Sequence, residues 1–106
     1  MRAGRDAGAT GCMTAALSPD LVRPAIAAHL SGDRNTAKDI YERVLPLINQ
    51  ENRLCGFRAA KAVMKAGGVI KSDFCRHPIA PLAPVVRKTL LDLAAELDPI
   101  ALRWGK

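Results

Sequence analysis

The chain has 106 residues, which is enough for one hydrophobic core and too few for two. Apolar residues make up 49% and charged residues 25%, as in ordinary globular proteins, but aromatic residues reach only 4%, so the core must be aliphatic. The net charge of +6 would attract nucleic acid or an anionic membrane surface, yet the basic residues are scattered, and no run of about 18 apolar residues could span a bilayer.

The cysteines predict neither a disulfide framework nor a metal site. Cys12, Cys55 and Cys75 are widely spaced, and no CxxC pair occurs. We expect reduced, mostly buried thiols, and neither a metal nor another cofactor. The first residues lack the apolar stretch of a signal peptide, so we predict a cytoplasmic protein.

The N-terminal region predicts one helix end and one strand. Arg2 to Ala9 is typical of the end of a small-residue helix that stops near Gly8. The apolar run Thr10 to Leu17 favours a buried strand at about residues 10–15, although a buried helical turn has a similar pattern. A parallel strand needs neighbours, and the chain offers it none.

A helix is predicted from Ser18 to about Leu30. It begins with a serine at the N-cap, a proline in the first turn and an aspartate beside the positive helix end. Ser31 and Gly32 end it. Pro24 either bends this helix or moves its start.

The clearest helical pattern follows Asp33, which we expect to cap it. Six apolar residues form one continuous stripe at helical spacing: Ala37, Ile40, Tyr41, Val44, Leu45 and Ile48. Pro46 lies inside this pattern and is expected to kink the helix.

Two further helices are predicted, with a loop between them. The first runs from about Gly56 to Ala66 and is closed by Gly67 and Gly68 in the left-handed conformation. Residues 69–84 carry three prolines and predict an extended loop laid across the helices. The last amphipathic helix ends at Leu97, before Pro99, and a short apolar tail follows.

Two groups of residues outside these stripes have alternative interpretations. Arg58, Lys61 and Lys65 share one helix face, which could neutralise phosphates or could be solvated and salt-bridged; the absence of interleaved aromatic residues favours the second interpretation. His29 and His77 lie far apart, and we interpret them as a packed helix residue and a loop residue rather than metal ligands.

Four segments, in this order, carry a family resemblance: GATGCMTAAL, SGDRNTAKDIYERVLPLIN, AAKAVMKAGGVI and RHPIAPL. Together they resemble the C-terminal third of the dihydrodipicolinate synthase/N-acetylneuraminate lyase family. The stretch ENRLCGFRAAKAVMKAGG and the terminal LRWGK resemble its 2-keto-3-deoxy sugar acid dehydratase branch. The short Ala16-Leu17-Ser18 connection departs from the family, where many members have a longer loop containing an asparagine.

The resemblance implies a fold class and a division of the chain. We expect a mainly α protein made of the C-terminal helices of a (β/α)8 TIM barrel family member, with one residual strand at about residues 10–15. Residues 1–30 would form the end of the barrel, comprising the end of helix 7, strand 8 and helix 8. Residues 31–106 would form the C-terminal helical extension.

The resemblance also implies what the site lacks. The family's lysine attacks the carbonyl of a 2-keto acid to form an imine, and a tyrosine transfers protons. Both would lie upstream of Met1, and no lysine here matches the catalytic position, so whether this chain is an enzyme is left open. Met13 falls where the family places an apolar residue against bound substrate; a buried strand methionine without a ligand is the alternative.

Two hypotheses for function follow. The first is a C-terminal fragment of a class I, Schiff-base lyase for aldol cleavage or dehydration of 2-keto-3-deoxy sugar acids, inactive by itself. Its implied partners are a small 2-keto acid in the intact protein and further copies in a homo-oligomer, often a tetramer. The alternative is a small basic helical module that self-associates or binds nucleic acid.

Overall fold

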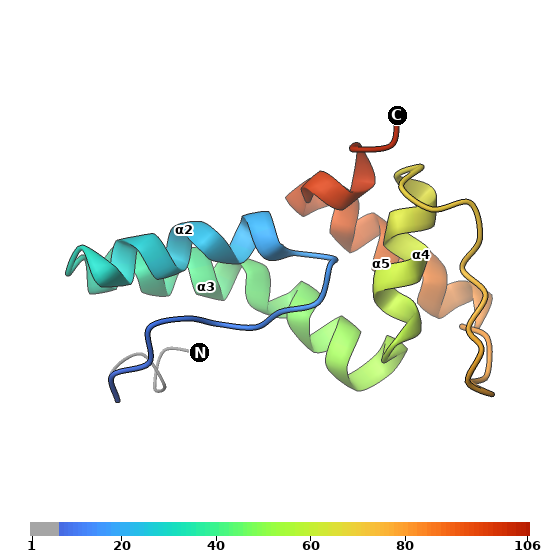
Figure 1. Ribbon diagram of the computed structural model, residues 1–106, viewed down its shortest axis with the longest axis horizontal. Coiled ribbons are helices and arrows are strands. Elements are labelled where there is room, and N and C mark those ends of the chain that lie inside the picture. The colour runs from blue at the N-terminus through green and yellow to red at the C-terminus, as the bar shows by residue number, and fades with distance from the viewer. Residues whose placement is uncertain (1–6) are drawn as a thin grey trace.

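A computed structural model describes residues 7–106, and these residues are helical without any strand (Figure 1). In chain order the elements are α2 (Pro19–Leu30), α3 (Arg34–Asn49), the π-helical turn η1 (Gln50–Cys55), α4 (Arg58–Ala66), α5 (Pro84–Leu97) and the 3-10 turn η2 (Ile100–Leu102). The prediction of a mainly α protein is therefore confirmed for this part of the chain. None of the described helices is long and apolar enough to cross a membrane.

Helices α2 and α3 form an antiparallel hairpin that projects from the rest of the molecule (Figure 1). Gly32 allows the tight turn because its φ of +87° is unfavourable for residues with a Cβ atom. Asp33 caps α3 as predicted, since its carboxylate accepts hydrogen bonds from the Thr36 amide at 3.1 Å and the Thr36 hydroxyl at 2.7 Å.

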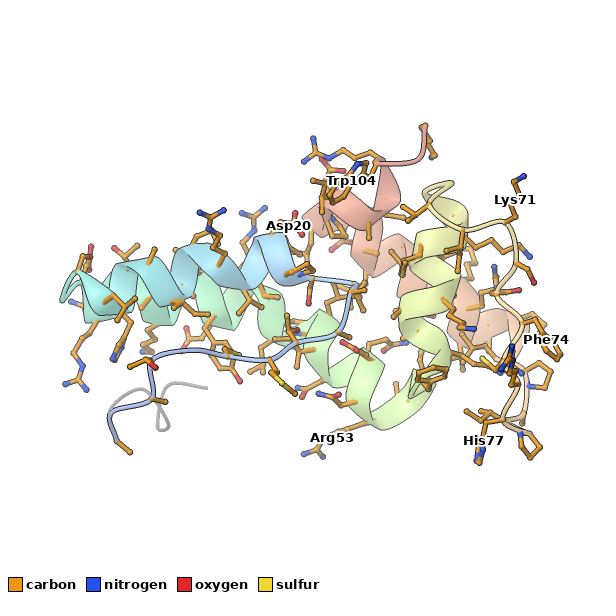
Figure 2. The ribbon with its side chains drawn as sticks, viewed as in Figure 1. Asp20, Arg53, Lys71, Phe74, His77 and Trp104 are labelled. Carbon is orange, nitrogen blue, oxygen red and sulfur yellow. The ribbon has the colours of Figure 1, made fainter. Side chains whose placement is uncertain are left out.

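The start of α2 is stabilised differently from the prediction. The helix begins at Pro19, so Pro24 does not move its start, but the Ser18 side chain makes no capping hydrogen bond and its hydroxyl is buried. The carboxylate of Asp20 instead accepts a hydrogen bond from the amide of Ile100 at 2.9 Å. This contact joins the first turn of α2 to η2, and Figure 2 shows Asp20 at this junction.

The strand predicted at residues 10–15 does not form, which corrects that expectation. This segment is extended and mostly exposed, and it runs beside the α2–α3 hairpin (Figure 1). A strand is defined by hydrogen bonds to a neighbouring strand, and the described residues supply no such neighbour. The helix expected from Arg2 to Ala9 lies largely outside the described residues, although Gly8 adopts a φ of +95° in a turn.

The second half of the molecule packs α4 against α5 and η2. Helix α4 starts at Arg58, two residues later than predicted, because η1 continues α3 to Cys55 and is followed by Gly56, whose φ is +57°. The 69–83 loop has no helix or strand, as predicted, and runs along α4 (Figure 1). The hydrophobic core joins both halves through small aliphatic residues, among them Leu17, Leu47, Ala59, Ala62, Val63, Leu90, Ala94 and Ala101.

Glycines allow the C-terminal residues to approach the end of α4 closely. The amide of Gly105 donates a hydrogen bond to the carbonyl of Gly67 at 3.0 Å. A Cβ atom on Gly67 would overlap the carbonyl of Ala101, although its φ of −81° is ordinary. Only Gly68 adopts the left-handed conformation predicted for both residues, with a φ of +75°.

The molecule is less compact than a closed domain of its size. Its radius of gyration is 14.6 Å, whereas about 13 Å is expected for 100 residues. It exposes 6837 Å², compared with about 5,700 Å² for a typical folded monomer of 11.3 kDa. Large apolar side chains account for part of the difference, because Met13, Leu54, Phe57, Phe74 and Trp104 are each at least 65% exposed.

Candidate functional site

A groove of about 490 Å³ surrounds Met13. The extended segment forms one wall, and α2, α3 and η1 form the others. Its lining residues are Cys12, Met13, Thr14, Ala15, Val22, Tyr41, Ile48, Glu51 and Asn52. Met13 is 98% exposed, so the alternative of a buried strand methionine does not hold for this chain.

Glu51 gives this groove its main electrostatic feature. Burial raises the pKa of the Glu51 carboxyl above its ordinary value, because the ionised form is poorly solvated there. Burial, followed by the nearby Glu51 carboxylate, raises the pKa of the Cys55 thiol. Both raised pKa values favour the uncharged forms of the two groups, as expected where apolar side chains surround them. Cys55 therefore has no reactive thiolate.

The groove does not assemble the catalytic groups expected of a Schiff-base enzyme. No lysine occurs among its described lining residues, although Tyr41 contributes part of one wall. Glu51 and Asn52 were not among the site residues predicted from the sequence. Both lie in the π-helical turn η1, and such a turn has no recognisable apolar period in the sequence.

The basic face of α4 is engaged with the 69–83 loop. Arg58 Nη2 donates a hydrogen bond to the carbonyl of Ile79 at 2.6 Å, and Lys61 Nζ donates to the carbonyl of Phe74 at 2.6 Å. Lys65 Nζ lies 3.3 Å from the Asp73 carboxylate. The prediction of a salt-bridged face is confirmed for Lys65, and all three cations have partners within the chain.

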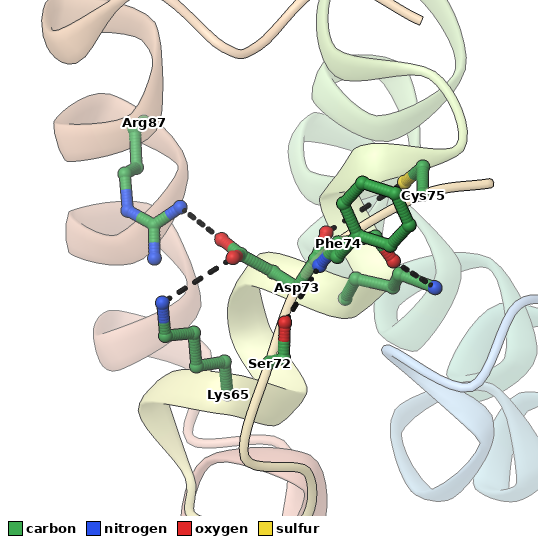
Figure 3. A network of polar contacts seen from close by, with 7 residues as sticks. Lys65, Ser72, Asp73, Phe74, Cys75 and Arg87 are labelled. Carbon is green, nitrogen blue, oxygen red and sulfur yellow. Dashed lines mark hydrogen bonds and ion pairs between the residues drawn. The ribbon is translucent and has the colours of Figure 1, made fainter. Parts of the chain in front are cut away.

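Asp73 is the centre of this network (Figure 3). Arg87 from α5 donates to its carboxylate at 2.8 Å, opposite Lys65 from α4. The Arg87 hydrogen bond, followed by that of Lys65, lowers the pKa of the Asp73 carboxyl to about 2. One loop carboxylate therefore ties two helices together, a role that no sequence periodicity indicated.

The cysteines and histidines take up no metal-binding arrangement within the described residues. Cys55 and Cys75 are buried free thiols and Cys12 is an exposed one, which agrees with the prediction of mostly buried thiols. His29 is half-buried on α2, and His77 is exposed on the 69–83 loop near Phe74 (Figure 2). No cluster of three or more metal-ligating side chains occurs in residues 7–106.

Comparison with known proteins identifies relatives along most of the chain. The model of the Dihydrodipicolinate synthetase family matches residues 1–97. An L-2-keto-3-deoxyarabonate dehydratase of Azospirillum brasilense is 49% identical over 99 residues, which cover 93% of this chain and 32% of the relative.

A second relative belongs to a different reaction branch. A 4-hydroxy-tetrahydrodipicolinate synthase of Acidiphilium cryptum is 36% identical over 86 residues, covering 76% of this chain and 28% of the relative. The chain therefore spans about a third of the length of these curated relatives. The higher identity to the dehydratase agrees with the resemblance to the sugar-acid branch drawn from the residues.

Proposed function

Because the chain belongs to the dihydrodipicolinate synthetase family, we propose that it is the C-terminal part of a Schiff-base lyase that acts on 2-keto acids. Dehydration of a 2-keto-3-deoxy sugar acid is the proposed reaction of the whole protein. The identity to a 2-keto-3-deoxyarabonate dehydratase over nearly the entire chain is the observation that carries this proposal.

The proposed division of the chain assigns residues 1–30 to the end of a barrel and residues 31–106 to a helical extension. Exposure of residues 10–14 supports this assignment, since an extended apolar segment is stable as a barrel strand only between two neighbours. The surface in excess of a compact monomer provides a second argument, because a barrel would cover it.

The chemistry of the whole protein would come from residues that this chain does not contain. In the proposed mechanism a lysine amine forms an imine with the 2-keto group, and the imine accepts the electron pair released at the neighbouring carbon. The remaining two thirds of the family's length would supply that lysine and the proton-transferring tyrosine. Met13, at the edge of the groove, would contact the bound keto acid through its apolar side chain.

Borohydride trapping tests this proposal. The 106-residue chain is incubated with pyruvate, reduced with borohydride and weighed by mass spectrometry, with the Azospirillum brasilense dehydratase as the positive control. We expect no adduct on this chain, because no lysine is among the described lining residues of the groove, and Lys61, Lys65 and Lys88 are engaged with partners within the chain. A stoichiometric adduct on one lysine would contradict the proposed inactivity.

Self-association is the second candidate function, and the exposed apolar side chains support it. Phe57 and Phe74 are 65% and 70% exposed, and Lys61 lies beside both, 5.8 Å from the Phe57 ring centroid and bonded to the Phe74 carbonyl.

Light scattering at increasing protein concentration tests self-association. If the aromatic pair forms the contact, the mass rises with concentration, and replacing Phe57 and Phe74 by serine restores the monomer. Leu30→Ser is the matched control, because Leu30 is equally exposed at the far end of the α2–α3 hairpin. A monomer at all concentrations would exclude this function.

A further inference from the structure

Polar side chains without a partner gather in the groove around Met13. The Thr14 and Tyr41 hydroxyls, the Glu51 carboxyl and the Asn52 carboxamide line it. None of these groups makes a hydrogen bond or an ion pair with another residue in the described part of the chain. Thr14 and Asn52 are exposed, Tyr41 and Glu51 are half-buried, and none of their polar atoms is among the fully enclosed unpaired ones. These groups are therefore accessible to a molecule that enters the groove.

Apolar side chains line much of the remaining groove, including those of Val22 and Ile48. Its volume of about 490 Å³ lies within the roughly 300–1,000 Å³ of small-molecule sites, which combine mostly apolar walls with a few polar groups. Glu51 and Asn52 lie on the π-helical turn η1, and such turns occur frequently at functional sites. The groove therefore has the size and the lining of a small-molecule site.

The charges of the lining determine which kind of molecule fits. No lysine or arginine is among the described lining residues, so a carboxylate or a phosphate group would find no counter-charge there. The Glu51 carboxyl accepts hydrogen bonds from hydroxyl groups, and its uncharged form, which burial favours by raising the pKa, also donates one. Carboxamide and hydroxyl groups likewise donate to and accept from alcohol hydroxyls. The lining therefore fits an uncharged part of a molecule that carries hydroxyl groups.

We propose that this groove holds the hydroxyl-bearing end of the substrate in the whole protein, and that Glu51 and Asn52 select a sugar acid over a smaller 2-keto acid. The inference rests on the proposed function, which places the keto acid against Met13. A substrate that extends from Met13 along the groove meets η1, because Met13, Glu51 and Asn52 line the same hollow. Pyruvate has no hydroxyl-bearing end, so its binding should not depend on either residue of η1.

A hybrid enzyme tests this selection. Residues 1–106 replace the segment of the Azospirillum brasilense dehydratase that matches them. Asn52→Ala and Glu51→Ala are each expected to raise the KM for 2-keto-3-deoxyarabonate about fivefold or more, since each removes a hydrogen bond to a substrate hydroxyl. The yield of pyruvate trapped on the hybrid by borohydride should stay unchanged in both variants.

Matched variants separate a substrate contact from a general effect on the helices. Asn49→Ala and Glu42→Ala remove the same groups from α3, at positions that do not line the groove, and should leave the KM unchanged. Glu51→Gln should retain most of the affinity, because a carboxamide still donates to and accepts from hydroxyl groups.

The hybrid distinguishes failure of this inference from failure of the proposed function. If the hybrid traps pyruvate but Asn52→Ala and Glu51→Ala leave the KM unchanged, or weaken pyruvate trapping equally, the selection by η1 is overturned and the proposed function stands. If the hybrid traps no pyruvate, the proposed function fails, and binding to the 106-residue chain decides whether the groove recognises hydroxyl groups.

NMR measures that binding with an uncharged probe. L-Arabinitol carries a hydroxyl group on every carbon, and 1,5-pentanediol is the control of equal chain length with hydroxyl groups only at its ends. L-Arabinitol is expected to shift the Asn52 carboxamide and Met13 methyl resonances to saturation, with a dissociation constant of about 10 mM or below. Shifts that do not saturate, or that 1,5-pentanediol reproduces, would overturn recognition of hydroxyl groups by the groove.

Discussion

Gly67 and Asp73 show how much single residues determine in this small protein. Gly67 has an ordinary backbone conformation, so its importance comes from the space that a side chain would take beside Ala101 and Leu102. Asp73 holds two helices through one carboxylate. Neither role follows from residue type alone, because glycine and aspartate are common in any loop.

We predict that Gly67→Ala destabilises the chain by at least about 1–3 kcal/mol, the usual cost of overpacking. The added methyl would push the 101–105 segment away from α4 and break the Gly105–Gly67 hydrogen bond. The midpoint of thermal unfolding measures this change. Gly11→Ala is the control, since its Cβ would meet nothing within 4 Å; equal midpoints for the two variants would refute the close approach.

At the scale of elements, the basic face of α4 and the 69–83 loop form one unit. A proline-rich loop of this length has few internal hydrogen bonds. Contacts with the cations of α4 and α5 therefore hold the 69–83 loop in place. The positive charges on this face therefore stabilise the fold. Arg58, Lys61 and Lys65 could have contacted phosphates, but they bind partners within the chain instead.

The loop should detach at low pH. The pKa of Asp73 is about 2 in the folded chain and 3.8 in its ordinary state, so the folded state favours the ionised carboxyl. Its contribution to stability is therefore complete above about pH 4 and is lost as the pH falls towards 2. The protection factor of the Phe74 amide, which is its exchange rate compared with the intrinsic rate at the same pH, is expected to fall over this interval.

Asp73→Asn provides the test of that assignment. In this variant the Phe74 amide should have little protection already at neutral pH, and the acid-dependent step should be lost. Asp92→Asn, which removes an exposed carboxylate paired with Lys88 on α5, is the matched control and should retain it. Retention of the step in Asp73→Asn would show that another carboxyl is responsible.

At the scale of the whole molecule, the notable properties are the exposed apolar side chains and the positive net charge. The extended segment and the α2–α3 hairpin leave apolar side chains in solvent, and the net charge of +6 is spread along the chain. Diffuse positive charge attracts polyanions without a defined site. Such attraction depends on released counterions and weakens steeply with salt.

We predict weak binding to DNA or RNA that disappears by about 0.2 M salt, measured by electrophoretic mobility shift. Arg58, Lys61 and Lys65 already have partners within the chain. Their joint replacement by glutamine should therefore reduce the mobility shift no more than the loss of three positive charges elsewhere on the chain. Lys38, Arg43 and Arg53 replaced in the same way provide the charge-matched control. A complex that persists at about 0.2 M salt would favour a nucleic-acid function instead.

The sequence by itself determined the helices, their order and the family. Apolar stripes at helical spacing, the Asp33 cap and the glycine and proline stops depend on residues within a few positions of one another, so local pattern is sufficient for them. The family resemblance likewise needs only the order of short motifs, and the match over residues 1–97 confirms it.

Tertiary structure decided what depends on distant residues. The strand predicted at residues 10–15 is absent because a strand exists only with a partner, and the described residues provide none. The Asp20 contact with Ile100, the approach of Gly105 to Gly67 and the Asp73 network join positions far apart in the chain. No local pattern encodes such pairs, because their energy arises only once the helices have packed.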